Sequence, residues 1–275
     1  MCNAGAAAGC GLWLVRNGPS SGGRSQGRGR AQRTAERVAG FVAIVGGSVE
    51  AWHLAQALPG ARVFLPATER VARLWPQGGG TVVTQGMPGP EALSGAVALI
   101  EAAHPCDARS ANRAAASARA AGLPHLQLVR PEWRAGPRDR WFALRDVRQA
   151  RALPRATRVL VTLGRAELTA LRGWQAHALV RRIGPARGGG FPLPRGRFLS
   201  APGPFSVADE IAMMRRERVD WLLLRNAGGS GGWPKLAAAR ALGLPVAMVA
   251  RPRRPDGARV ATVEEALAWL DRQKS

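Results

Sequence analysis

Short apolar runs alternate with amphipathic stretches along most of this chain. The first run, 41–45, ends at a Gly-Gly-Ser turn, and a helical spacing follows over 49–58. The same order of strand, turn and helix then recurs. Further strands are predicted at 61–65, 81–83, 96–103, 124–131, 158–165, 176–184, 219–226 and 245–252, and further helices at 110–122, 147–153, 166–174, 206–218, 235–242 and 262–273. This alternation is typical of parallel sheets covered by helices.

Two breaks in the pattern divide the chain. The segment 134–140 is charged and interrupted by Gly and Pro, as expected of a linker, and residues 1–39 are rich in Gly, Ser and Arg without apolar periodicity. We therefore predict an α/β protein with two Rossmann-like parallel-sheet domains, 40–135 and 136–275, and an interdomain cleft. Residues 1–39 are predicted to be a disordered basic extension. A transit peptide and a start codon placed too early are alternative interpretations of this extension.

Composition adds a strong positive charge to this picture. The chain has 275 residues, 46% of them hydrophobic, and a net charge of +22. Arginine supplies nearly all of the positive charge, since Lys235 and Lys274 are the only lysines in the sequence. Such a charge attracts polyanions, although a GC-rich genome would also produce an arginine excess. No apolar stretch is long enough to cross a bilayer. The three cysteines, Cys2, Cys10 and Cys106, have no metal-ligand spacing and suggest no disulfides, so a cytoplasmic protein without a metal site is expected.

Glycine-rich turns at strand ends suggest anion binding. A parallel strand that leads into a helix presents backbone N–H groups at the helix start, and glycine lets an anion approach them closely. The candidate turns are Gly46, Gly47 and Ser48; Gly164 and Arg165; and Asn226, Gly228 and Gly229 with Lys235 downstream. The alternative is that each glycine only allows a tight turn. Repetition at successive strand ends favours ligand binding over this alternative.

Other candidate residues point to a nucleotide-dependent reductase. Arg70 follows the second strand, where an arginine suits a 2′-phosphate, so it favours NADPH over NADH; a surface arginine is the alternative. His104 follows a predicted strand and could bind a carboxylate or carry a proton, or make a structural hydrogen bond. No Ser-His-Asp order, phosphate-loop lysine motif or catalytic carboxylate pair can be assembled. This fits an enzyme whose cofactor carries the chemistry.

Several of these segments resemble motifs of the precorrin-6A reductases of cobalamin biosynthesis. VGGSVEAWHLAQAL (45–58) is similar to their Gly-Gly-Thr-x-Glu-Ala turn and LVRPEW (128–133) to their Arg-Pro-x-Trp stretch. The other resembling segments are EAAHPCDARSAN (101–112), VLVTLGRAEL (159–168), APGPFSVADEIAMM (201–214) and LRNAGGSGGWPKLAAARALGLPVAMVARP (224–252). The resemblance covers about residues 40 to 252.

The chain departs from the family pattern at a few positions. Arg225 replaces a lysine, Trp233 a tyrosine, and Cys106 and Asp107 a Phe-Ala pair. The chain between residues 91 and 101 is short, which predicts that one helix of the first domain is trimmed.

The resemblance implies an NADPH-dependent reduction of one macrocycle double bond of precorrin-6A, giving precorrin-6B. The partner would be a polycarboxylate tetrapyrrole rather than nucleic acid or a membrane, and a monomer is expected. Expected cofactor contacts are Gly46, Gly47, Ser48, Arg70, Gly164, Arg165, Asn226, Gly228, Gly229 and Lys235. Expected substrate contacts are His104, Ser110, Gly203 and Phe205, and no catalytic residue is assigned. A nucleic-acid-binding protein and a non-catalytic nucleotide-binding module are the alternatives.

Overall fold

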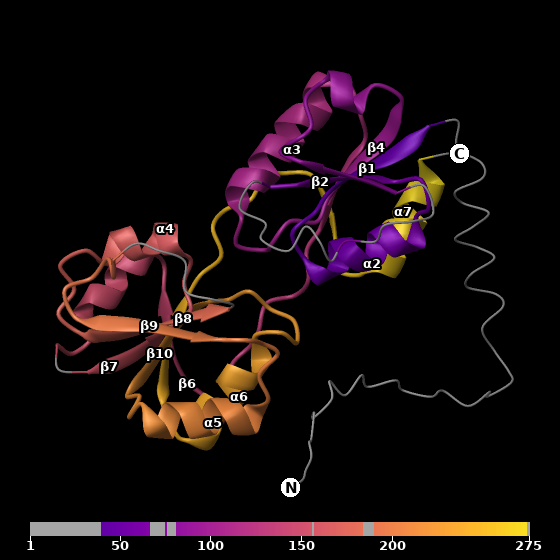
Figure 1. Ribbon diagram of the computed structural model, residues 1–275. Helices are drawn as coiled ribbons and strands as arrows, with labels where there is room; N and C mark the ends of the chain where they lie inside the picture. Colours follow the sequence, from indigo (N-terminus) through magenta and orange to yellow (C-terminus); the bar gives the residue numbers. More distant parts are fainter. Residues whose placement is uncertain (1–39, 67–74, 76–80, 156, 184–189, 274–275) are drawn as a thin grey trace, which may run out of the picture.

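The computed structural model describes residues 40–66, 75, 81–155, 157–183 and 190–273. They form two six-stranded sheets whose strands are all parallel, with helices on both faces of each sheet (Figure 1). The predicted α/β class with two parallel sheets is confirmed. Within the described chain, no helix has the length and apolar character that a membrane crossing needs.

The first sheet has its opening strand at the centre. Its order is β12-β5-β4-β1-β2-β3. The strands are β1 (Phe41–Val45), β2 (Arg62–Leu65), β3 (Val82–Gln85), β4 (Ala96–Glu101), β5 (His125–Leu128) and β12 (Ala258–Val260). One face is covered by α2 (Val49–Ala57) and α7 (Val263–Arg272), and the other by α3 (Ala108–Ala120). Between β3 and β4 there is only a 3-10 turn, η2 (Glu91–Leu93), which agrees with the predicted trimmed helix.

The second sheet repeats this arrangement, with the order β6-β11-β10-β7-β8-β9. Its strands are β6 (Arg140–Leu144), β7 (Arg158–Val161), β8 (His177–Ile183), β9 (Gly196–Ala201), β10 (Trp221–Arg225) and β11 (Pro245–Val249). Helices α5 (Val207–Arg216) and α6 (Trp233–Ala241) pack on one face. The other face carries α4 (Arg165–Leu168) and the 3-10 helices η3 (Val147–Ala152) and η4 (Thr169–Leu171).

Side-chain caps fix where four of the helices begin. Ser48, Asp107, Ser206 and Thr262 each accept a hydrogen bond from the backbone N–H three residues further on. Each such bond satisfies a donor that the first helical turn cannot satisfy itself. At the last of these helices, Thr262 and Glu265 form a capping box. Because these caps follow strand ends, they also place the helix starts at the carboxyl edges of the sheets.

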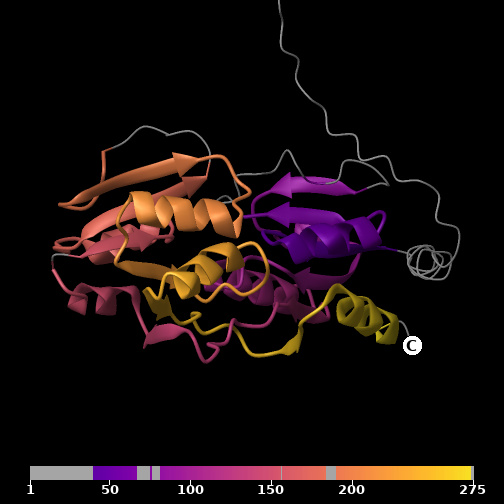
Figure 2. The same cartoon turned by 90° about the horizontal axis from the view of Figure 1, so that it is seen from below.

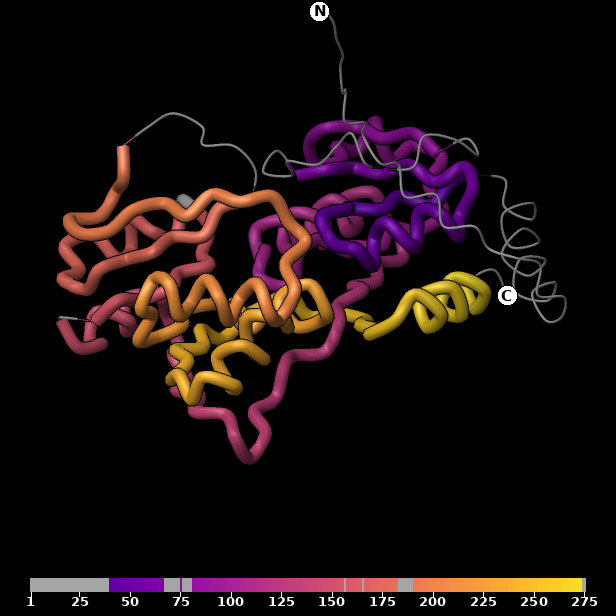
Figure 3. The backbone as a smooth tube through the Cα atoms, turned by 60° about the horizontal axis from the view of Figure 1, so that its bottom comes forward, coloured from indigo at the N-terminus to yellow at the C-terminus, as the bar shows by residue number. Residues whose placement is uncertain are grey.

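The first sheet takes its edge strand β12 from the end of the chain, and this corrects the predicted domain boundary. β6 precedes the rest of the second sheet, whereas β12 follows it in sequence but pairs with β5 of the first sheet. The chain therefore crosses between the sheets twice, at about 129–139 and 250–257 (Figure 3). The expected second domain, 136–275, wrongly included β12 and α7. Figure 2 shows the last crossover running back to the first unit, where α7 packs against α2.

Neither edge strand β6 nor edge strand β12 was predicted from the sequence. β12 has only three residues, none of them buried, so it lacks the apolar run that marks the central strands. β6 contains the apolar residues 141–144, but none of its residues is buried and it directly follows the charged segment 134–139. The expected linker 134–140 consequently ends where β6 begins.

A buried ion pair attaches the second crossover to the first sheet. Arg254 pairs with Glu101 at the end of β4, and their side chains are 5% and 0% exposed. The Arg254 guanidinium also donates to Gln127 Oε1 at 3.1 Å and to the Pro105 carbonyl at 3.2 Å. Glu101 accepts a further bond from the Ala103 N–H at 2.8 Å. Both charges are thus compensated, so the returning chain is held at a fixed place on the first sheet.

The Arg254→Ala variant should lose about 3–5 kcal/mol of unfolding free energy, because Glu101 would remain buried without its partner. Denaturant unfolding followed by circular dichroism measures this loss. Arg253→Ala is the matched control, because its only ion pair within the described residues, with Asp256 at 3.9 Å, lies at the surface, with the two side chains 90% and 97% exposed. Equal unfolding midpoints for the two variants would contradict the role given to Arg254.

Candidate functional site

The carboxyl edges of the two sheets approach each other at their central strands. In each sheet the strand order reverses next to the central strand, between β1 and β4 in the first and between β7 and β10 in the second. Ligands of open α/β sheets bind at such reversal points. The Cys106 Sγ, which follows β4, lies 4.0 Å from the carbonyl oxygen of Asn226, which follows β10. The two reversal points are therefore close in space.

Arg130, on the first crossover, joins these two edges. Its Nη1 donates to Glu50 Oε2, in the first turn of α2, at 2.7 Å. Its Nε donates to the carbonyl oxygens of Ala227 and Gly228, after β10, at 2.9 and 3.1 Å. The Arg130 and Glu50 side chains are 14% and 18% exposed, so solvent screens their pairing less than at an open surface. One side chain thus fixes the helix start of one unit relative to the loop of the other.

Arg251, on the second crossover, supports the same junction. Its Nε donates to the Asn226 carbonyl at 2.7 Å, and its Nη1 donates to the Arg130 carbonyl at 2.9 Å. Its Nη2 also reaches the carbonyls of Pro131 and Ala227, at 3.2 and 3.1 Å. The two crossovers are therefore cross-linked where they pass between the sheets.

The turn after β1 combines packing constraints with free backbone donors. A Cβ on Gly46 would lie 2.7 Å from the Trp75 ring, and Gly47 has a φ of +132°, so both positions favour glycine. The Ser48 hydroxyl accepts from the Ala51 N–H at 3.1 Å and donates to the Ala102 carbonyl at 2.7 Å. Within the described chain, the N–H groups of Gly47 and Ser48 make no hydrogen bond. They lie at the start of α2, where the helix dipole favours an anion.

The glycine-rich loop after β10 packs closely against the first crossover. A Cβ on Gly228 would lie 2.0 Å from the Pro131 carbonyl oxygen, and one on Gly229 would lie 2.7 Å from the Arg130 side chain. Both glycines have positive φ, +68° and +73°. The Trp133 indole N–H donates to the Gly229 carbonyl at 2.8 Å. These glycines therefore make room for protein backbone and for the arginine that joins the units.

Asn226 is part of the same junction. It is 8% exposed, and its carboxamide accepts from the Trp133 N–H at 2.8 Å and donates to the Trp133 carbonyl at 3.0 Å. This two-sided bond reproduces the pairing of neighbouring strands. The side chain expected to bind a ligand thus holds the crossover.

Lys235, in the first turn of α6, lies near a buried ion pair. The Arg181 Nη2 donates to Glu210 Oε2 at 2.8 Å, with the two side chains 9% and 1% exposed. The Arg181 guanidinium also lies over the Phe205 ring, 4.1 Å from its centroid. Desolvation lowers the pKa of Lys235; the charge of Glu210 opposes this shift and that of Arg181 adds to it. Within the described chain, the Lys235 amine makes no ion pair within 4 Å, so it can receive an anionic group of a ligand.

Comparison with known proteins identifies the family. The sequence profile described as "Precorrin-6x reductase CbiJ/CobK" matches residues 41–271. The precorrin-6A reductase of Rhodococcus erythropolis is 38% identical over 244 residues, which cover 83% of this chain and 96% of that protein. The chain belongs to the precorrin-6x reductase family.

Further relatives agree with this assignment. The precorrin-6A reductase of Rhodobacter capsulatus is 37% identical over 175 residues, covering 62% of this chain and 69% of that protein. A solved structure described as CobK precorrin-6A reductase superposes with a TM-score of 0.75 at 31% identity, covering 85% of this chain and 97% of that one. The resemblance seen in the sequence motifs is therefore confirmed.

Two of the other expected site residues, Ser110 and Gly164, hydrogen-bond within the protein. Ser110 is buried, and its hydroxyl donates to Asp107 Oδ2 at 2.7 Å as part of the cap of α3. The Gly164 N–H donates to Glu167 Oε2 at 2.9 Å, and Glu167 also pairs with Arg225. Arg70 and the side chain of Arg165 lie outside the described residues. Gly203 and Phe205 lie in the loop between β9 and α5. As ligand contacts, all of these positions remain predictions.

His104 lies at the junction with one face exposed to solvent. Its Nδ1 accepts from the Cys106 N–H at 3.2 Å, and the residue is exposed. Desolvation, and then the charge of Arg130, lower the pKa of His104. Burial raises the pKa of Cys106 to about 11, so this thiol stays protonated at neutral pH. No group of three or more His, Cys, Asp or Glu side chains in the described chain could hold a metal ion.

Three of the residues that hold the junction were not among the candidates from the sequence. Glu50, Arg130 and Arg251 all lie in or beside motifs that carry the family resemblance, but nothing in the local pattern assigns them a partner. Glu50 and Arg130 are separated by 80 residues, and Arg130 and Arg251 by 121. Membership of those motifs was the one signal that could have pointed to them.

Replacing Gly228 by Ala should destabilise the protein. A left-handed conformation costs a non-glycine residue about 1–2 kcal/mol, and the contact of the new Cβ with Pro131 adds to this loss. Gly231→Ala is the matched control in the same loop, because nothing lies within 4 Å of its Cβ position. Urea unfolding compares the two variants. Equal losses of free energy would show that the loop does not pack against the crossover as described.

Proposed function

We propose that this protein catalyses the NADPH-dependent reduction of precorrin-6A to precorrin-6B, with both ligands bound between the facing carboxyl edges of the two sheets. The observation that carries the proposal is the family match over residues 41–271, together with the junction that brings the two strand-reversal points within contact. The match also removes the reason for the nucleic-acid alternative, which rested on charge alone. We further expect a monomer that acts in the cytoplasm.

The turn after β1 fits a phosphate group of the dinucleotide. The N–H groups of Gly47 and Ser48, which make no hydrogen bond within the described residues, lie at the start of α2, and Gly47 has no side chain that would block an anion there. The acid in this helix turn, Glu50, is neutralised by Arg130 at 2.7 Å, so it repels an anion less than a free carboxylate would. When bound, the nicotinamide supplies the hydride. Arg70 remains the sequence-based reason to prefer NADPH over NADH.

The cationic groups of the second unit fit the peripheral carboxylates of the tetrapyrrole. Arg181, Lys235 and Glu210 together carry a charge of +1 when all are ionised, and the Glu210 charge is already paired with Arg181. This leaves the Lys235 amine to bind a carboxylate or a phosphate. Phe205, which stacks on Arg181, offers an apolar surface in the same cluster. His104, which is exposed beside the junction, is a second candidate contact from the first unit.

The central test is a turnover assay on the purified full-length protein. When it is mixed with precorrin-6A and NADPH, the NADPH absorbance should fall and the absorption spectrum of the tetrapyrrole should change. The amounts of NADPH oxidised and precorrin-6A converted should be equal. NADH should react more slowly if the preference for NADPH is right. Binding of NADPH without any turnover of precorrin-6A would instead support the non-catalytic nucleotide-binding module.

The charge of Lys235 should control ligand affinity and its pH dependence. Lys235→Gln should weaken binding of NADPH or precorrin-6A by about 1.5–3 kcal/mol, the range for a hydrogen bond to a charged group. Only the protonated amine attracts an anion, so wild-type affinity should fall as the pH rises through the pKa of Lys235, which lies below the usual 10.5.

Lys235→Arg is the control, because arginine stays charged throughout this pH range. It should retain affinity at alkaline pH. Tryptophan fluorescence titrations and KM values for both ligands measure these effects. Unchanged affinity for both ligands in Lys235→Gln would exclude Lys235 from the site.

A further inference from the structure

A cavity of about 340 Å³ lies at the amino edge of the second sheet, opposite the proposed reductase site. One wall is the end of η3 and the residues that lead into β7; the other is the turn between η4 and β8. The side chains that matter are Arg151, Leu153, Arg155, Arg172, Trp174 and Gln175. Its volume is at the small end of the range for ligand sites in proteins, roughly 300–1,000 Å³.

Three arginines and no acidic residue line this cavity. No ion pair of the described chain involves Arg151, Arg155 or Arg172. Acidic side chains elsewhere in the same unit already form ion pairs with other arginines. The pairs are Glu217 with Arg158, Arg197 and Arg216, Glu210 with Arg181, and Asp139 with Arg240. Three like charges around one concave space repel one another until an anion enters.

The cavity has a fixed frame. The Arg151 Nη2 donates to the Arg172 carbonyl at 2.8 Å, which braces the two walls against each other. The Gln175 side chain donates to the Gly173 carbonyl at 3.0 Å and holds the turn before β8. Trp174 is 3% exposed and packs in the core of the unit, so the floor of the cavity is also held in place.

Arginines near helix ends have a simpler explanation, which covers only part of this cluster. The carboxyl end of a helix carries a partial negative charge that favours a cation in its last turn. This accounts for Arg151, in the last turn of η3. It does not account for Arg155, which lies beyond the helix, or for the convergence of arginines from two separate segments on one cavity.

We propose that this cavity is a second, separate binding site for a small molecule with at least two anionic oxygens, either a phosphate ester or a polycarboxylate. Planar guanidinium groups bind the oxygens of both classes in pairs. Leu153, which is partly exposed, gives the ligand an apolar surface beside its charged end. The site lies at the opposite end of the strands from Gly164 and Asn226, so it does not depend on the proposed reduction.

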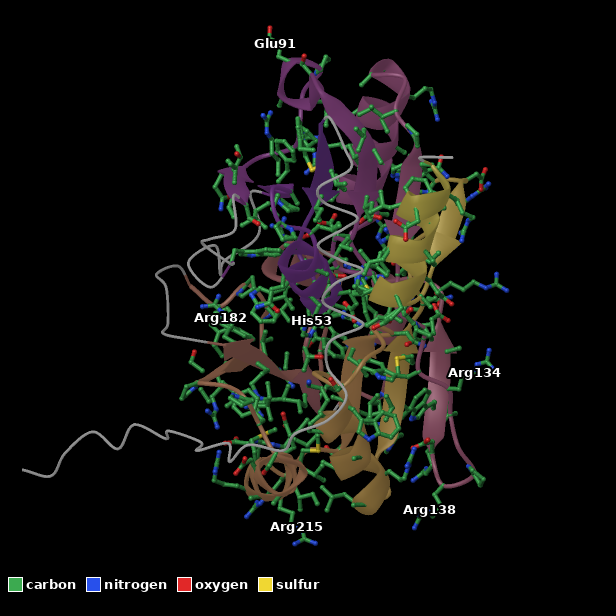
Figure 4. All side chains as sticks on the ribbon, turned by 90° about the vertical axis from the view of Figure 1, so that its right-hand side faces the viewer. His53, Glu91, Arg134, Arg138, Arg182 and Arg215 are labelled. Atoms are coloured by element: carbon green, nitrogen blue, oxygen red, sulfur yellow. The ribbon has the colours of Figure 1, made fainter. Side chains whose placement is uncertain are left out.

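Isothermal titration calorimetry on the full-length protein, with inorganic pyrophosphate and citrate as probes at physiological ionic strength, tests this proposal. The double variant Arg155→Gln/Arg172→Gln should lose at least tenfold in affinity for one or both probes. A control, Arg138→Gln/Arg215→Gln, removes the same net charge from two exposed positions that project outward in Figure 4, and it should bind like the wild type.

Each outcome decides the proposal. Loss with pyrophosphate alone indicates a phosphate ester, loss with citrate alone indicates a polycarboxylate, and loss with both supports the shared chemistry. Absence of binding to the wild type, equal affinity in the cavity variant, or equal weakening in the control would overturn the proposal, the last because net charge alone would then explain the binding. Unchanged thermal unfolding of the cavity variant shows that a loss of affinity does not come from misfolding.

Discussion

The Arg130 side chain bonds simultaneously to the first helix of one sheet and to the loop after the central strand of the other. Its partners, Glu50 and the carbonyls of Ala227 and Gly228, come from segments that are far apart in the chain. Arg251 and Asn226 secure the same crossover from the other side. Without this junction the two carboxyl edges would have no defined relation, and neither could contribute to a common site.

The junction also gives the glycine-rich loop after β10 a structural role that the turn after β1 does not have. The glycines after β10 let the crossover and Arg130 approach the loop backbone, so this packing accounts for them without a ligand. The turn after β1 differs, because its N–H groups, at the start of a helix, make no hydrogen bond within the part of the chain that the structure describes. The two turns look alike in sequence, yet one is filled by the protein and the other can receive an anion. This supports placing a cofactor phosphate in the first unit.

The return of β12 makes the first sheet depend on the second crossover. The first sheet takes its sixth strand from beyond the second unit, and the buried pair of Arg254 and Glu101 fixes the returning segment. Two crossovers restrict relative motion of the units more than a single linker would. For a reaction that requires hydride donor and acceptor to be aligned, such a restriction favours a preorganised geometry.

The sequence by itself determined the α/β class, the central strands and most of the helices, because apolar runs and capping residues act over a few neighbouring positions. It also carried the family motifs, which the comparisons confirmed. The tertiary structure alone decided that β12 and α7 join the first sheet, that Asn226 holds Trp133, and that Arg130 pairs with Glu50. These features depend on which distant segments meet. No local periodicity encodes such a meeting for a short, exposed edge strand or for side-chain partners 80 or more residues apart.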